Sequence, residues 1–108
     1  MPEMSYSKID DPTEEIRLKL DAPVFVNLWS RTCAPCLVEL RELSKAHERL
    51  RAKGLTIVAL NVDALNDDSA DLDTIRNLAI KSGYTFEIGF ATPESAGILE
   101  SVQRAVLD

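Results

Sequence analysis

The chain holds two cysteines, Cys33 and Cys36, separated only by Ala34 and Pro35. They stand between an apolar run at 24–30 and a segment with helical periodicity. Pro35 lacks an N–H and fixes its own φ, which suits the first turn of a helix. The two sulfurs are then held within bridging range. The feature therefore requires a strand that ends where a helix begins, with both thiols at the junction.

The flanking segments fit that requirement. The run "VFVNLWS" at 24–30 is rich in β-branched and aromatic residues, which predicts a strand buried on both faces. The following pattern predicts a helix from about 34 to 53 that stops at Gly54. One face of this helix carries residues spaced by four and three: Cys36, Leu40, Leu43, His47 and Leu50.

Strand and helix patterns continue to alternate along the chain. After the first helix we expect a strand at 55–63, a polar loop at 64–73, a helix at 71–82 that ends at Gly83, a short strand at 84–91 and a last helix opened by Thr92 and Pro93.

The first twenty residues show weaker patterns. Residues 1–10 are polar, and we expect them to be a loose segment. Residues 10–20 suggest a short helix, with Asp11 as its cap and Pro12 at its first position.

Alternation of strands and helices indicates parallel pairing through right-handed crossovers. We therefore predict a single α/β domain over 11–108, with a small, mostly parallel sheet and helices on both faces. The length of 108 residues fits one domain.

Charge narrows the possible partners. Eighteen acidic residues against twelve Lys and Arg give a net charge of −6, which argues against nucleic-acid binding and against docking on anionic membranes. No segment approaches the roughly 20 apolar residues of a membrane span, and no secretory signal is visible at the start.

The position of the thiols suggests redox chemistry. The first turn of a helix has unpaired N–H groups and the positive end of the dipole, so a Cys33 thiolate is stabilised there. Arg31 could add positive charge. The thiolate is the form that attacks a disulfide, and Cys36, one turn further on the apolar face, could resolve the mixed disulfide. The alternative is that both cysteines are small buried hydrophobic residues.

A metal site is disfavoured. His47 is the only histidine, and it lies fourteen residues after Cys33. A site of two cysteines, this histidine and a carboxylate stays open, but nothing sets up tetrahedral ligand spacing. We expect no metal and no bound cofactor.

The stretch from 24 to 40, which contains the predicted strand and the C-x-P-C motif, resembles the thioredoxin superfamily. Within it, the resemblance is to the TlpA-like, AhpC/TSA-related thiol–disulfide oxidoreductases, which include reductases serving cytochrome c maturation. The second predicted strand, "LTIVALNVD", is also similar. The residues that carry the family's strand and C-x-P-C pattern are Asn27, Leu28, Trp29, Ser30, Arg31, Thr32, Cys33, Ala34, Pro35, Cys36 and Glu39.

The resemblance implies a thioredoxin-like fold and roles for these side chains. Cys33 would be the nucleophile, Cys36 the resolving thiol and Trp29 a wall of the active-site surface. Glu39 falls where relatives place an acid near the cysteines; it could handle protons or be an ordinary exposed carboxylate. Asn27 stands where thioredoxins often carry a buried acid, and it cannot act as a base.

Three departures from the family pattern stand out. Thr32 replaces an aromatic residue, and Arg41 replaces a proline that kinks the helix. Relatives also continue past the last helix into a cis-proline loop, a β-hairpin and a final helix. We therefore expect a fragment of a longer protein, or another chain, such as a second copy, covering strand 24–30. We expect Pro93 to be trans, at a helix start.

The leading hypothesis is disulfide exchange with protein thiols and an upstream redox donor. The resemblance also implies an exported or membrane-tethered protein. A non-catalytic binding or structural module is the alternative. A peroxiredoxin-type peroxidase is less favoured: Ser30 fits its pattern, whereas Val26 stands where it requires proline.

Overall fold

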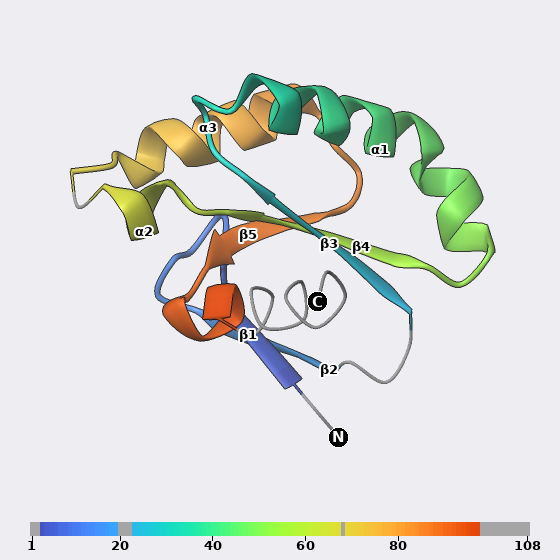
Figure 1. Cartoon of the computed structure of the whole chain (residues 1–108), viewed down its shortest axis with the longest axis horizontal. Coiled ribbons are helices and arrows are strands. Elements are labelled where there is room, and N and C mark those ends of the chain that lie inside the picture. The colour runs from blue at the N-terminus through green and yellow to red at the C-terminus, as the bar shows by residue number, and fades with distance from the viewer. Residues whose placement is uncertain (1–2, 20–22, 68, 98–108) are drawn as a thin grey trace, which may run out of the picture.

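A computed structural model describes residues 3–19, 23–67 and 69–97, which form a five-stranded mixed sheet with strand order β2-β1-β5-β4-β3 (Figure 1). Two long helices cover one face of this sheet. The elements in chain order are β1 Glu3–Lys8, β2 Glu15–Lys19, β3 Val24–Trp29, α1 Ala34–Ala52, β4 Thr56–Asn61, α2 Asp63–Asn66, α3 Leu72–Ser82 and β5 Glu87–Ala91.

The parallel half of the sheet confirms the sequence prediction. β3 pairs with β4 in parallel from Val24↔Thr56 to Trp29↔Asn61, and β4 pairs in parallel with β5. α1 and α3 make the crossovers, as the alternating patterns predict. α3 matches the helix predicted at 71–82: Asp71 is its N-cap, and it ends at Gly83 as predicted, whose φ of 71° is the left-handed conformation that favours glycine.

The N-terminal part corrects two predictions. The segment predicted to be loose forms β1 at Glu3–Lys8, and the helix predicted at 10–20 is replaced by a turn and β2. β1 inserts between β2 and β5 with antiparallel pairing on both sides, including Tyr6↔Ala91. Asp11 does act as a cap, but of a turn, because its carboxylate accepts the Thr13 N–H at 3.1 Å and the Thr13 hydroxyl at 2.6 Å.

Gly89 allows β1 to lie close to β5. A Cβ at this position would stand 2.5 Å from Cδ2 of Tyr6 and 2.6 Å from the carbonyl oxygen of Ser7. Neither group can move freely, since Tyr6 is buried and Ser7 belongs to the sheet backbone. Glycine is therefore required for this pairing.

Two further details differ from the prediction. The predicted polar loop at 64–73 contains the short helix α2. Thr92 opens a helical turn at 93–97, where the Ser95 N–H donates to the Thr92 hydroxyl at 3.1 Å. None of the described peptide bonds is cis, so Pro93 is trans as expected. The rest of the predicted last helix lies outside the described residues.

The apolar core lies on both faces of the sheet. One cluster joins the sheet to α1 and α3 through Trp29, Leu40 and Ile75, and a second lies on the opposite face around Met4 and Leu60. The turn at 93–97 lies on that opposite side (Figure 1). None of the described helices is long and apolar enough to cross a membrane.

β3 lies at an edge of the sheet, and its two faces are only partly covered, which corrects the prediction of a strand buried on both faces. Phe25 and Leu28 are 40% and 36% exposed, on opposite faces of the strand. Asn27 and Trp29, toward the carboxyl end, are buried. The end of β3 that leads into the cysteine loop is thus the better covered end.

Candidate active site at the start of helix α1

Cys33 and Cys36 are joined by a disulfide across the start of α1, with their Cα atoms 5.3 Å apart. Both residues are half-buried. Cys36 packs against the core cluster under α1. The sequence prediction that the two sulfurs lie within bridging range is confirmed.

The local backbone explains this placement. Cys33 is the N-cap residue of α1, with Pro35 in the first turn, as predicted. The Cys36 N–H points at Sγ of Cys33 at 3.3 Å, and the Leu37 N–H donates to the Cys33 carbonyl at 3.1 Å. The first turn of α1 contains no acidic residue. The positive end of the helix dipole therefore faces the Cys33 sulfur without a carboxylate in that turn to offset it.

Arg31 is held by an acid that sequence reasoning did not single out. Asp63, 8% exposed, accepts the Arg31 backbone N–H at 3.1 Å, and its other oxygen lies 3.8 Å from Nε of the Arg31 guanidinium. The Asn61 side chain donates to the same carboxylate at 2.8 Å and accepts the Asp63 N–H at 3.0 Å. The positive charge of Arg31 is thus paired with Asp63.

The position of Asp63 in the sequence could have identified it as a site residue. Asp63 follows the buried strand β4, and the carboxyl ends of neighbouring parallel strands meet at one edge of the sheet. An acid at that position lies beside the loop that follows β3. We call Arg31, Asn61 and Asp63 the Asp63 network.

Glu39 and Asn27 form a second polar contact. Asn27, 5% exposed on β3, donates from Nδ2 to Oε1 of Glu39 on α1 at 2.5 Å. Oδ1 of Asn27 is buried and has no partner in the described part of the chain. Glu39 is exposed, but this bond distinguishes it from an ordinary surface carboxylate.

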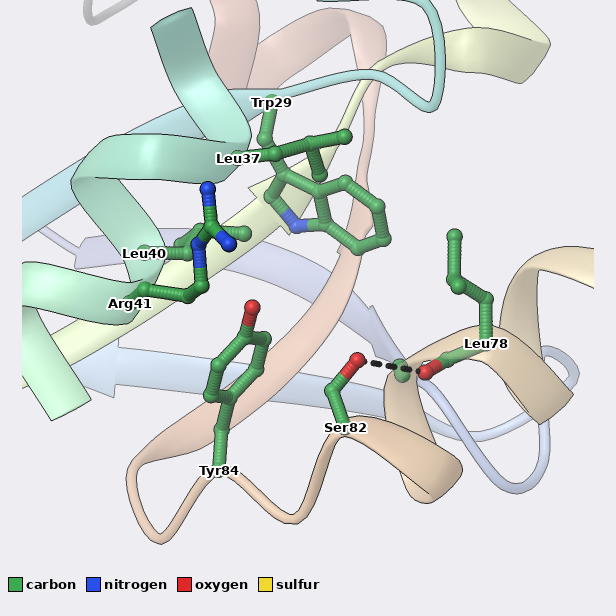
Figure 2. A pocket seen from close by; sticks show the side chains of 8 residues that line it. Trp29, Leu37, Leu40, Arg41, Leu78, Ser82 and Tyr84 are labelled. Atoms are coloured by element: carbon green, nitrogen blue, oxygen red, sulfur yellow. Dashed lines mark hydrogen bonds between the residues drawn. The ribbon is translucent and has the colours of Figure 1, made fainter. Parts of the chain in front are cut away.

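Trp29 is placed differently from the prediction. Only 2% of the residue is exposed, so it does not form a wall of the surface. Its ring lies between α1 and α3 and lines a cavity of about 260 Å³ (Figure 2). Arg41, at the position where relatives carry a proline, lines the same cavity.

His47 lies away from the cysteines, as predicted. Its Nδ1 lies 2.6 Å from the Thr85 hydroxyl, and its ring meets Phe86 edge-on at 5.8 Å. Among the residues that the structure describes, no group of three or more His, Cys, Asp or Glu side chains could hold a metal ion.

A parallel βαβαβ core with a disulfide closing the start of its first long helix defines a thioredoxin-like α/β protein. The chain matches the AhpC/TSA family over residues 2–92 and belongs to that family.

Solved structures share this fold. A thiol:disulfide interchange protein from Bacteroides sp. matches with a TM-score of 0.67 and 15% identity over 89% of this chain and 59% of its own. A conserved protein from Geobacillus kaustophilus gives 0.72 and 23%, covering 92% of this chain and 55% of its own. A thioredoxin-family thiol:disulfide interchange protein from Chlorobium tepidum TLS gives 0.65 and 24%, covering 87% and 61%. The chain thus spans less than two thirds of the length of each.

Proposed function

We propose that this chain exchanges disulfides with protein thiols through Cys33 and Cys36. The observation that carries the proposal is the disulfide at the N-terminus of α1, with Cys33 at the N-cap. A sulfur in that position gains from the helix dipole when it is a thiolate, and both cysteines are half-buried rather than enclosed.

The exchange proceeds in two steps. In the dithiol form, the Cys33 thiolate attacks one sulfur of a substrate disulfide, forms a mixed disulfide and expels the other substrate thiolate. The Cys36 thiolate then attacks Sγ of Cys33, which releases the second substrate thiolate and closes the Cys33–Cys36 bond. The substrate gains two electrons and two protons, and an upstream thiol donor must return the pair to the dithiol.

Neighbouring side chains have supporting roles in this proposal. Pro35 supplies no N–H and fixes the backbone between the two sulfurs. Glu39 accepts or supplies a proton near the cysteines, and its bond to Asn27 holds it in place. Trp29 supports the loop from beneath, because it is the last residue of β3 and is buried under α1.

Trapping the mixed disulfide tests the order of attack. Reduced Cys36→Ser, mixed with native insulin whose disulfides are intact, should accumulate a covalent adduct through Cys33, because no second thiol resolves it. Reduced Cys33→Ser is the matched control and should form far less adduct in the same time. Equal adduct formation by the two variants, read by mass, would contradict the assignment of Cys33 as nucleophile.

We also propose that a second copy of the chain pairs with the open edge of β3. The Pro23 carbonyl accepts the Thr56 N–H at 3.1 Å and the Trp29 carbonyl accepts the Val62 N–H, just after β4, at 2.9 Å. The odd-numbered residues of this segment therefore face β4. The alternate residues Val24, Val26 and Leu28 therefore direct their N–H and C=O groups outward, at an edge that no strand of the described residues covers. Such an edge invites another strand.

Oligomeric state and amide exchange test this pairing together. A dimer by light scattering, with the outward amides of Val24, Val26 and Leu28 exchanging slowly, is the expected result. A monomer in which these three amides exchange fast while those of Phe25 and Asn27 exchange slowly would contradict the pairing.

A further inference from the structure

We propose that the cavity between α1 and α3 binds a small organic carboxylic acid, with its apolar body between the helices and its carboxylate on Arg41. The site shares no side chain with the disulfide, although Leu37 in its wall directly follows Cys36. The proposal is thus independent of the redox function.

The walls of the cavity are mostly apolar. Leu37 and Leu40 of α1 face Leu78 of α3, and the buried indole ring of Trp29 lies behind them (Figure 2). The volume of about 260 Å³ lies just below the range of roughly 300–1,000 Å³ typical of ligand pockets. It therefore suits a small ligand with one ring or a short chain.

Two hydrogen-bond donors from different segments line this cavity: the Arg41 guanidinium on α1 and the Tyr84 hydroxyl after α3. Figure 2 shows the Tyr84 hydroxyl pointing toward Arg41, and the nitrogen of the indole turned to the Arg41 side. Neither Arg41 nor Tyr84 donates to an acceptor in the described part of the chain, whereas Nε1 of Trp29 is fully buried and lies behind the cavity wall.

Ser82, a further polar residue that lines the cavity, already has a hydrogen-bond partner. The Ser82 hydroxyl donates to the Leu78 carbonyl at 2.8 Å, within α3 (Figure 2). Arg41, in contrast, has no carboxylate partner among the described ion pairs. The other arginines of the helix, Arg49 and Arg51, lie in its last turn. A cation and a neutral hydroxyl donor at an apolar cavity match a carboxylate oxygen pair better than a neutral ligand.

Trp29 is the only tryptophan in the chain, so its indole N–H gives one nuclear magnetic resonance signal that reports directly from the site. Phenylpropionate is the probe, titrated into the isotope-labelled full chain. We expect a saturable shift of the indole signal, because Trp29 lines the cavity. Arg41→Gln, which keeps the stem of the side chain, should weaken binding by about tenfold or more, because it removes a charge-assisted contact.

Controls separate this site from general effects. Arg49→Gln removes a positive charge from the same helix outside this cavity, and it should leave the affinity unchanged. Leu78→Glu places an acid at the rim, on a side chain that is 40% exposed, and should also weaken phenylpropionate binding. A Cys33→Ser/Cys36→Ser variant should still bind, since the cysteines take no part.

The neutral analogue phenylpropanol tests carboxylate recognition, and it should bind about tenfold more weakly than phenylpropionate. Equal binding of the two probes, an unchanged affinity in Arg41→Gln or the absence of a saturable shift would overturn the proposal.

Discussion

Two groups of polar side chains flank the carboxyl end of β3, and they differ in how their hydrogen bonds are satisfied. In the Asp63 network the described donors find acceptors at 2.8–3.1 Å. At the cavity between α1 and α3, the donors of Arg41 and Tyr84 have no acceptor in the described part of the chain, nor does the indole N–H of Trp29 buried behind them.

We therefore assign a structural role to the Asp63 network and a ligand-binding role to the donors at the cavity. A buried polar network that is satisfied internally fixes the backbone around it, here the loop before Cys33. The donors of Arg41 and Tyr84, by contrast, face the cavity without an internal acceptor, which leaves them able to bind a ligand. Substitutions in the two groups should therefore change different properties of the protein.

The largest effect on stability is expected from Asp63→Ala. The substitution leaves the buried Asn61 amide and the Arg31 backbone N–H without their acceptor. We expect the free energy of unfolding to fall by about 2–3 kcal/mol, measured by urea denaturation.

The matched control is Asp73→Ala, which removes an exposed carboxylate paired with Arg76 at 3.4 Å. Its cost should stay below about 0.5 kcal/mol. Similar values for the two variants would mean that the Asp63 network does not hold the loop.

Trp29→Phe should cost less than Asp63→Ala although Trp29 is the more deeply buried residue. The change removes an N–H that has no acceptor among the described residues, so only ring volume is lost. We expect a loss of about 1 kcal/mol in the free energy of unfolding. A loss of 3 kcal/mol or more, on the order of a buried hydrogen bond plus a cavity, would show that the indole N–H is satisfied in solution.

Arg41→Gln should leave stability almost unchanged, within about 0.5 kcal/mol, because Arg41 is exposed on α1. The same variant should lose phenylpropionate affinity, as argued above. Thermal unfolding with and without the probe measures both properties in one experiment, since a ligand that binds the folded state raises the melting temperature. A large loss of stability without ligand would place Arg41 with the structural group instead.

The smallest expected effect on stability is at Asp71, an exposed carboxylate that accepts hydrogen bonds from the first turn of α3. Hydrogen bonds from the Thr74 hydroxyl and backbone N–H hold the pKa of Asp71 below its usual value. This lowered pKa contributes stability that is present above about pH 4 and is lost as pH falls through the folded pKa. Asp71→Asn keeps a helix cap but does not titrate, so the stability difference from the unsubstituted protein should shrink on acidification from about pH 6 to about pH 3.

Urea denaturation at the two pH values measures this difference. Asp73→Asn, in the same helical turn, is the matched control and should show a smaller pH dependence. A difference between Asp71→Asn and the unsubstituted protein that grows on acidification would contradict the sign of the effect.

The parts of the fold that local patterns encode were predictable from the sequence. The period of α1, the cap and stop residues of α3 and the apolar runs of β3 and β4 are each set by residues close together in the chain. The cysteine pair belongs to this class, because its position depends only on where one strand ends and the next helix begins.

The N-terminal hairpin was not predictable in the same way. β1 pairs with β5, and Tyr6 meets Ala91 far away in the sequence, so nothing near Tyr6 specifies a strand. Asp11 and Pro12 suit a turn as well as a helix start, because an Asp side chain accepts nearby N–H groups in both. The alternation of Ile16 and Leu18 with exposed residues was the strand signal that the capping pattern obscured.

The contrast between local patterns and distant contacts also explains which site residues could be predicted from the sequence. Cys33 and Cys36 carry a local motif, whereas Asp63, Arg41 and Tyr84 come to the end of β3 from separate elements. Trp29 was singled out, but its burial depends on how α1 and α3 pack over the sheet.

The most direct test of the redox pair is its equilibrium with a defined thiol buffer. The purified chain is equilibrated across a glutathione or dithiothreitol series, free thiols are alkylated and the fraction of Cys33–Cys36 disulfide is read by mass. A reversible, intramolecular two-electron transition is the expected result, with a tenfold change in the equilibrium constant for each roughly 30 mV. Thiols that stay reduced throughout the series, or that form only intermolecular disulfides, would contradict disulfide exchange at this site.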